Sequence, residues 1–529
     1  MSIANGPLAE NAPQPLPSVE PVAASEERGK IVAAKPKPTD ELIPVGELET
    51  DLPSAFPGAT VTPIDMPTAL GLVEVRNPNF LLAQQRVLET MALRQLAAAQ
   101  YLPTLNLGVN YDDHTGPLQQ SSGNILPVQR SALFVGAGAN AIAAGTVNIP
   151  GVLWQQNAGD ALFGLLQANQ AIARARANTA ATRNTMGLNV ALAYLDLLEA
   201  EGRRSIALQI RQEAAELTRI TEAHARTGQG RYADANRATT ELADFDARAI
   251  EAEGDTFRMS ARLSQLLGLD QSTRLHPTDN WVVPHPLVPE LIPLEELLAI
   301  AIVQRPELAE YRAAVEQAML ALRGAQLLPF SPNVFLGFSS GAFGGGSNLV
   351  AQPPGSSQFA SGQPRFGDFA GRADFDAMMY WTLKNLGVGN SAQIEGARAR
   401  LSTVAWQRLV VFETVRLEVS NAHAYARMRL AQLDASELAI RAATQSWTED
   451  LNRIRSLEGL PIEAVNSLRL MARARLAYLD SIIGYNRSQF QLYVALGQPP
   501  ADALARPAPI EQVGAEQASS EPRAPESAP

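Results

Sequence analysis

The sequence contains no cysteine, and this absence excludes several kinds of chemistry. Without a thiol the chain cannot form disulfides, bind zinc through cysteine, use a cysteine nucleophile or carry a lipid on a mature N-terminal cysteine. Only five histidines are present, and they are scattered along the chain: His114, His224, His276, His285 and His423. We therefore expect no metal site, no cofactor and no catalytic centre.

Long apolar runs and an excess of positive charge are also missing. An uncharged stretch at 131–159 is interrupted by glycine and proline, so the sequence predicts no transmembrane helix. The net charge is −11, which argues against nucleic acid as a partner, because nucleic-acid binders carry basic patches. Residues 1–30 lack a basic n-region and an apolar h-region, so no signal peptide is visible.

Both ends of the chain differ in composition from its middle. Residues 1–62 are rich in proline, alanine and glutamate, and we expect a disordered or extended arm there, with a similar tail at 499–529. Between them we expect two copies of one unit, 63–270 and 294–498, joined by a linker at 271–293. Four landmarks support the duplication, because each recurs after 228 to 231 positions: Pro78 and Pro306, Gly108 and Gly337, Gly228 and Gly459, Gly268 and Gly497.

In each copy a helical sequence runs directly into a strand. The first strands are expected at 103–112 and 333–340, and in the former every second residue from Leu105 to Tyr111 is apolar. A glycine-rich loop is expected after each of them, at 112–146 and 341–372. If the strands cross a membrane, such loops would lie outside the cell.

The second strand is clearest in the second copy. One face carries Phe375, Ala377, Met379, Trp381 and Leu383, and the other carries Asp376, Met378, Tyr380, Thr382 and Lys384. In the first copy a weaker strand is expected within 146–157, where Pro150 permits only an edge or end position.

Very long helices follow the strands. In the first copy the helix is expected from Asp160 to Thr227, which is about 100 Å. The helices at 67–101 and 231–267 sum to a similar length, so we expect them to stack end to end beside it. Seam spacings of 3, 4 and 7 indicate coiled-coil packing in both copies: Ile206, Ile210, Leu217 and Ile220, and Ile440, Trp447, Leu451 and Ile454. The predicted fold is mainly α with a small β part, built on duplicated long-helix coiled-coil hairpins.

Four strands per chain cannot close a barrel, and an open sheet with an apolar face leaves exposed edges. An apolar outer face with a polar inner face is typical of a membrane barrel, for which several chains would pool their strands. The alternative is a soluble α+β protein whose strands pair in an ordinary sheet.

At this point the sequence resembles the outer-membrane efflux proteins, the TolC-like channel-tunnels, over about residues 66–498. The resemblance rests on the repeated strand entry at Leu102-Pro103 and Leu328-Pro329, on "WTLKNLGVGNSAQIEGARARL", and on the turns "RTGQGRYADANRATTEL" and "RIRSLEGLPIEAVNSLRLMARARL". It implies a homotrimer with a twelve-stranded transmembrane β-barrel in the cell outer membrane and an α-barrel tunnel in the periplasm. It further implies a periplasmic adaptor (membrane fusion) protein, an inner-membrane pump and outer-membrane lipid as partners, and passive export in tripartite efflux or type I secretion.

The family's turn motif has a glycine, often followed by leucine, at the hairpin tip, with an arginine four residues earlier. The second copy has Arg455, Gly459 and Leu460 at these places, and by resemblance this tip docks the adaptor. Equally, Gly459 could simply end a helix, where a positive φ favours glycine.

The first copy has Gly228 and Gly230 at its tip, and both are assigned by resemblance to adaptor docking. Alignment of Gly228 with Gly459 places His224 at the arginine position and Gln229 at the leucine position. Gly228 could also be only a helix-ending residue.

Two further sets of residues are candidates for function. On the second strand we expect Phe375, Met379, Trp381 and Leu383 to face lipid. Near the second turn, Glu449, Asp450 and Glu458 could form an acidic ring at the tunnel mouth, although exposed charge that serves solubility is an alternative. A function of another class also remains open, in which the hairpins act as a periplasmic coiled-coil scaffold or envelope spacer without channel activity.

Overall fold

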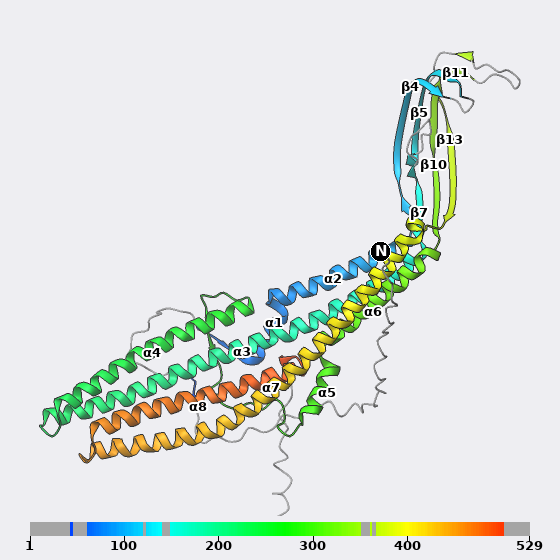
Figure 1. The fold of residues 1–529 in the computed structure, drawn as a ribbon. Coiled ribbons are helices and arrows are strands. Elements are labelled where there is room, and N and C mark those ends of the chain that lie inside the picture. Colours follow the sequence, from blue (N-terminus) through cyan, green and yellow to red (C-terminus); the bar gives the residue numbers. More distant parts are fainter. Residues whose placement is uncertain are drawn as a thin grey trace, which may run out of the picture.

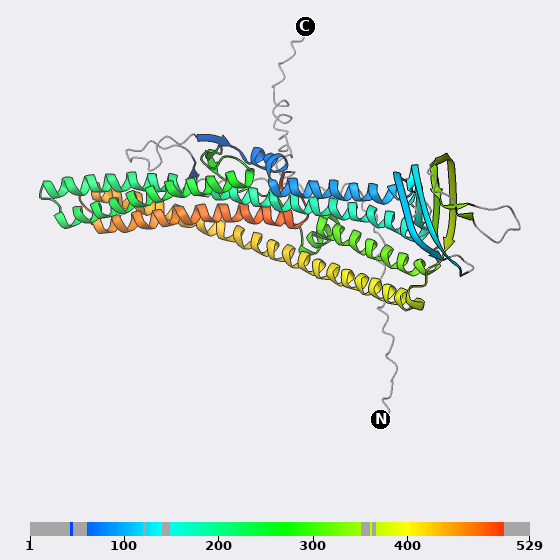
Figure 2. The same ribbon diagram turned by 90° about the horizontal axis from the view of Figure 1, so that it is seen from above.

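The computed structural model describes residues 43–45, 61–119, 123–139, 149–350, 360–361 and 367–501. Two long helical hairpins lie side by side at one end of an elongated molecule, and a β-sheet stands at the other end (Figure 1). The view from above in Figure 2 shows the same division.

The two copies have the same order of elements. The first contains α1 (Met66–Arg76), α2 (Pro78–Ala99), β3 (Thr104–Leu105), β4 (Leu107–Gln119), β5 (Ile125–Ala139), β6 (Ile149–Pro150), β7 (Val152–Asn157), α3 (Ala158–Arg226) and α4 (Tyr232–Leu267). The second contains α5 (Leu294–Gln304), α6 (Pro306–Leu327), η1 (Leu328–Phe330), β10 (Asn333–Ser347), β11 (Leu349–Val350), β12 (Ala360–Ser361), β13 (Gly367–Tyr380), η2 (Lys384–Gly387), α7 (Val388–Arg455) and α8 (Pro461–Ala495). The predicted duplication is therefore visible in the fold.

Helix α3 has the predicted length, and α7 is almost equally long. Helix α3 has 69 residues and α7 has 68, so each extends about 100 Å. Asn157 starts α3, because its Oδ1 accepts hydrogen bonds from the backbone N–H of Gly159 at 3.0 Å and of Asp160 at 3.1 Å. No helix within the described ranges is both long enough and apolar enough to span a membrane.

The shorter helices stack end to end along the long ones, as their lengths predicted (Figure 1). Asn77 caps the start of α2 with its Oδ1, and its Nδ2 donates to the carbonyl of Leu266 at the end of α4, at 2.8 Å. In the second copy Arg305 lies at the start of α6, and its guanidinium donates to the carbonyl of Val494 near the end of α8, at 3.4 Å.

The predicted seam residues lie in one continuous core. All eight are less than one tenth exposed: Ile206, Ile210, Leu217, Ile220, Ile440, Trp447, Leu451 and Ile454. Burial of each such side chain contributes about 1.5–3 kcal/mol, and this burial, rather than helix propensity, holds the hairpins together.

Parts of the predicted arm and linker form a small belt around the middle of the helices. Strand β1 (Ile43–Pro44) pairs with β9 (Trp281–Val282), and β2 (Val61–Ile64) pairs with β8 (Arg274–Pro277). Ile43 and Val45 are buried, and residues 61–62 lie in β2, so these parts of the predicted disordered arm are ordered, which corrects the prediction for 43–45 and 61–62. The other residues of the arm up to 60, and residues 502–529 of the tail, lie outside the described residues.

The sheet has four columns of strands. Their order is β3 with β4, then β5 with β7, then β10, then β13. The second column is interrupted, because β10 pairs with β7 along 333–338 and with β5 along 340–347. All these pairings are antiparallel, so four strands per chain, as predicted, is correct once the interruptions are allowed for.

The predicted glycine-rich loops are largely strand, which is a correction. Within 112–146 lie the end of β4 and all of β5, and within 341–372 lie the end of β10, β11, β12 and the start of β13. Close strand approach accounts for the glycines: a Cβ added to Gly136 would lie 2.5 Å from the Cα of Gly341. Glycine can mark such an approach as readily as a loop.

Candidate functional site

The strand register gathers apolar side chains on one face of the sheet. Directly opposed residues of antiparallel strands point to the same side. One row across all four columns consists of Val109, Val135, Ala342 and Gly371. Further rows on this face are Val152, Phe338 and Phe375, then Trp154, Leu336 and Ala377. The apolar alternation of single strands therefore becomes one continuous surface.

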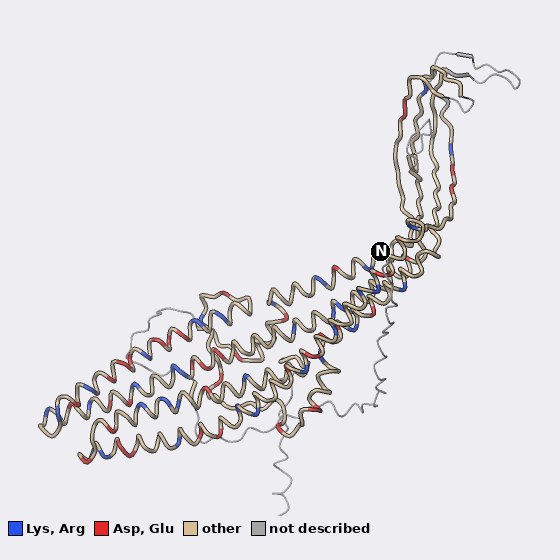
Figure 3. The backbone as a smooth tube through the Cα atoms, viewed as in Figure 1, with Lys and Arg blue, Asp and Glu red and all other residues tan. Residues whose placement is uncertain are grey.

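The opposite face of the sheet is more polar. On this face His114 and Arg130 lie directly opposite each other on β4 and β5. The register places five further glycine or charged residues on the same face: Gly108, Asp112, Arg372, Asp374 and Asp376. Asp113, near the loop end of β4, is an exception that shares the apolar face. Figure 3 shows how few charges the sheet carries, compared with the densely and evenly charged helices.

The predicted lipid-facing residues divide into two groups. Phe375 and Met379 lie in β13 on the apolar face, and both are exposed. Trp381 and Leu383 follow the last residue of the strand, so their placement within a strand was wrong. Pairing ends at Tyr380 because its partner is Asn333, the first residue of β10, and no strand remains opposite 381–383.

Both outer edges of the sheet are unpaired in the single chain. Among the described residues, β4 pairs only with β5, and β13 pairs only with β10. Edges of this length are templates for strand pairing with another chain.

At the hairpin tips, the positive φ falls on different residue types in the two copies. Gly228 has φ +78°, as predicted for a helix-ending glycine. In the second copy Leu457 takes this conformation, with φ +65°, and Gly459 does not. The interpretation of Gly459 as a residue that needs positive φ was therefore wrong.

Gly459 instead lies at a close approach of the turn to the end of α7. Its N–H donates to the carbonyl of Arg453 at 3.0 Å, and an added Cβ would lie 3.0 Å from the Cβ of that residue. Gly230 makes the same bond to His224 at 2.9 Å, with an added Cβ 3.1 Å away. Gly230 and Gly459 are thus the equivalent pair.

Pairing Gly230 with Gly459 gives an offset of 229 residues between the two copies, and this corrects the alignment of the tips. Arg226 then corresponds to Arg455, so the arginine of the turn motif is present in both copies. Arg231, rather than Gln229, corresponds to Leu460. His224 corresponds to Arg453 and is not at the arginine position.

The second tip presents apolar side chains and a link between the hairpins. Leu457 is 52% exposed and Leu460 is 61% exposed. Arg455 on α7 forms an ion pair of 3.3 Å with Glu216 on α3. Hydrogen bonds from Arg219 first, and then from Arg455, hold the pKa of Glu216 below its usual value.

The three acidic residues near this tip have different environments. Asp450 is partly buried, accepts a hydrogen bond from Ser467 and pairs with Arg453 at 3.7 Å. Glu449 is exposed and accepts a hydrogen bond from Gln445 at 2.8 Å, and Glu458 is also exposed. Within one chain Asp450 therefore links α7 to α8. The acidic ring at the tunnel mouth stays a prediction for all three residues.

A buried charge cluster at the belt was not predicted. Glu201 on α3 is 1% exposed and pairs with Arg274 at 3.1 Å and with His276 at 3.4 Å. Burial disfavours its charged form, but the hydrogen bond with His276 and the charges of Arg274 and Arg204 outweigh this, so the pKa of Glu201 is lowered. Only the fold brings α3 and β8 together, and no spacing in the sequence indicates the cluster.

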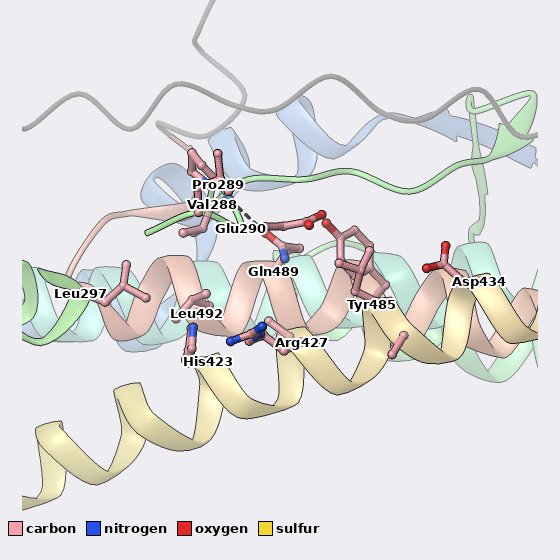
Figure 4. Close-up of a pocket in the computed structure, with 14 residues that line it drawn as sticks. Val288, Pro289, Glu290, Leu297, His423, Arg427, Asp434, Tyr485, Gln489 and Leu492 are labelled. Carbon is pink, nitrogen blue, oxygen red and sulfur yellow. Dashed lines mark hydrogen bonds between the residues drawn. The ribbon is translucent and has the colours of Figure 1, made fainter. Parts of the chain in front are cut away.

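One pocket, of about 390 Å³, lies between the linker and helices α7 and α8 (Figure 4). Gln489 clamps the linker to α8, because its Oε1 accepts hydrogen bonds from the N–H of Leu287 and Val288, both at 3.0 Å. Burial, with the charge of Glu290, raises the pKa of Tyr485 to about 12, so this phenol stays protonated. No group of three metal-binding side chains occurs anywhere in the described ranges.

The sequence and the structure were compared with those of known proteins. Residues 69–269 match the family described as Outer membrane efflux protein. A search of curated proteins gave no match. The structure is similar to the outer-membrane channel OprN, with 19% identity and a TM-score of 0.63 over 82% of this chain and 89% of that one.

Two further solved structures agree. The outer membrane protein VceC from Vibrio cholerae has 16% identity and a TM-score of 0.62, over 82% of this chain and 96% of that one. The CmeC outer membrane channel from Campylobacter jejuni has 13% identity and a TM-score of 0.63, over 82% and 85%. Residues 69–269 are therefore similar to the outer membrane efflux protein family, and the chain has the fold of these solved outer-membrane channels over most of its length.

Proposed function

We propose that the protein is the outer-membrane channel-tunnel of a tripartite efflux or type I secretion system. It would conduct substrates passively from an inner-membrane pump and a periplasmic adaptor to the outside, without catalysis. The observation that carries this proposal is the register of the sheet, which aligns apolar side chains in rows such as Val152, Phe338 and Phe375 on one face. A soluble sheet has no reason to expose such a face, whereas a membrane barrel requires it.

Closure of the barrel follows from the strand directions. Three successive antiparallel pairings separate β4 from β13, so these edge strands run in opposite directions. The β13 edge of one copy can therefore pair antiparallel with the β4 edge of the next. Two copies would give about eight strands, whose interior side chains fill, so we propose three copies and an open lumen. The polar face, with Arg372, Asp374 and Asp376, would line that lumen.

The hairpin tips lie at the end of the molecule farthest from the sheet (Figure 2). With the sheet in the outer membrane, they would reach about 100 Å into the periplasm. Exposed Leu457 and Leu460 give the second tip an apolar surface, which supports the proposed docking of an adaptor there. The first tip has Gly228 and Arg231 at these positions, so we propose that the two tips contact the adaptor differently.

A scaffold or envelope spacer without channel activity is the second candidate. The long hairpins would suit it equally well. The exposed Phe375 and Met379 argue against it, because a spacer gains nothing from apolar side chains on an open sheet.

The mass of the protein in detergent tests the proposal. The expected species has three times the 56.7 kDa of one chain after the bound detergent is subtracted. A stable monomer with both sheet edges open would contradict the proposal. A trimer that forms without detergent would favour the scaffold.

A further inference from the structure

The chain makes a strained turn where β13 ends and α7 begins. Asn385, Leu386 and Gly387 are consecutive residues with φ of +50°, +58° and +93°. Glycine adopts this conformation freely and asparagine tolerates it, but leucine gains nothing locally to offset a cost of about 1–2 kcal/mol. Strain of this kind is retained where the conformation is useful.

The turn is also held firmly in place. The N–H of Lys384 donates to Oδ1 of Asn390 at 2.7 Å, and Asn390 is buried at the start of α7. Gly389 allows a close approach, because an added Cβ would lie 3.1 Å from Oδ1 of Asn385. The direction in which Leu386 projects is therefore fixed by the fold.

Leu386 projects away from the protein, together with other apolar side chains. It is 97% exposed. The indole N–H of Trp381 donates to the carbonyl of Phe330 at 3.2 Å, which brings the end of η1 to the same place. We name these exposed residues the junction patch: Phe330, Trp381, Leu383, Leu386 and Val388. Four of its five residues follow Met379 in the sequence, where the chain passes from β13 to α7 at the base of the sheet (Figure 1).

A single unpaired ammonium group accompanies the junction patch. The sequence has only four lysines, at 30, 35, 37 and 384, so Lys384 is the one lysine in the part that the structure describes. Within that part its side chain has no ion-pair partner. Lysine beside tryptophan is typical of the level where lipid headgroups meet acyl chains, because the ammonium reaches phosphate while the ring stays apolar.

We propose that the junction patch inserts into the phospholipid leaflet nearest the helices, with Leu386 below the headgroups and Lys384 bound to an anionic phosphate. This inference rests on the proposed function, in which the sheet spans the membrane. The strained turn then has a role, because it fixes the depth of the barrel at the point where sheet becomes helix. Continuity with the sheet face and the positive charge of Lys384 favour lipid as the occupant over a second copy of this chain.

The absence of cysteine makes a direct test simple, because one introduced thiol is unique. Leu386→Cys labelled with an environment-sensitive nitrobenzoxadiazole probe is reconstituted into phosphatidylethanolamine–phosphatidylglycerol vesicles, with and without lipid that carries a nitroxide near the headgroup. We expect blue-shifted emission and quenching of about twofold or more by the nitroxide lipid. Val388→Cys repeats the test if the first variant fails to assemble, and adding Lys384→Glu should reduce the quenching.

Phe375→Cys and Gln229→Cys are the matched controls, one on the sheet and one at the far tip. If Phe375→Cys is blue-shifted and Leu386→Cys shows blue-shifted emission that the nitroxide lipid does not quench, the patch packs against a neighbouring copy and this inference is wrong. Emission typical of water at Leu386→Cys would also overturn it. If Phe375→Cys also gives emission typical of water, the proposed membrane barrel itself fails.

Discussion

Leu457 occupies a backbone conformation that does not suit its side chain, and its replacement separates stability from docking. Its φ of +65° costs about 1–2 kcal/mol for an L-residue, while glycine costs about 0.5–1 kcal/mol more than alanine in chain entropy. Since Leu457 is 52% exposed, little burial is lost on its removal. Leu457→Gly should therefore leave the free energy of unfolding unchanged or raise it by up to about 1 kcal/mol.

The same substitution should reduce export if Leu457 contacts the adaptor. Circular dichroism of the detergent-purified protein should give a melting midpoint equal to that of the parent or up to about 2 °C higher. Drug susceptibility of cells that depend on this channel, with crosslinking to the adaptor, reports docking. We expect weaker crosslinking and lower export from an intact assembly.

Gly228→Ala is the matched control, because Gly228 holds the equivalent position with φ +78° and open space around an added Cβ. Only backbone strain acts there, so we expect a loss of about 1–2 kcal/mol. A lower melting midpoint for Leu457→Gly would show that Leu457 is needed for packing. Unchanged stability together with unchanged export would refute the adaptor contact.

Three further substitutions test other parts of the account. Leu460→Asp should abolish crosslinking to the adaptor and leave assembly intact, because Leu460 is 61% exposed, whereas Gln229→Asp, at an already polar position, should change export little. Ala377→Arg places a charge on the apolar face, at a cost of about 2–4 kcal/mol near the membrane centre, and should prevent assembly in vesicles. Trp381→Arg lies beyond the strand end and should be tolerated. Equal effects of the two substitutions would contradict the assigned depths. Glu201→Gln tests the belt by thermal melting against pH. Because the pKa of Glu201 is lowered, its charge stabilises the fold above the unfolded value of about 4.3, and this stability is lost as the pH falls. The variant should therefore melt earlier than the parent at pH 7 and lose less stability between about pH 5 and 3, and a pH profile parallel to that of the parent would refute this role.

The helical part of the fold follows from periodicity alone. The seam through Ile206 and Ile440 has coiled-coil spacing, and long uninterrupted helices need no distant partner to be recognised. The strands were harder to predict, because glycines such as Gly136 and Gly341 are typical of loops until the opposing strand is known. Their role in close approach is a property of the pair and not of either segment.

For the sheet face, the sequence indicated which residues lie together but not where the strand ends. The apolar alternation of β13 identified the face of Phe375 and Met379, but only the register to Asn333 shows where the strand ends. At the tips, matching one glycine to another gave an offset of 231, although the conformational equivalent of Gly228 is Leu457. Alignment of the two copies by sequence pairs identical residues. The backbone of the second tip instead repeats the positive φ of the first tip at a different residue type.

Single-channel recording with introduced thiols tests the central claim most directly. Asp376 and Phe375 are neighbours on β13 but lie on opposite faces of the sheet. We expect the purified protein to give discrete conductance steps in a planar bilayer, and a charged, membrane-impermeant thiol reagent to reduce the conductance of Asp376→Cys and leave that of Phe375→Cys unchanged. Absence of conductance, or an equal response of both variants, would contradict a channel lined by the polar face of the sheet.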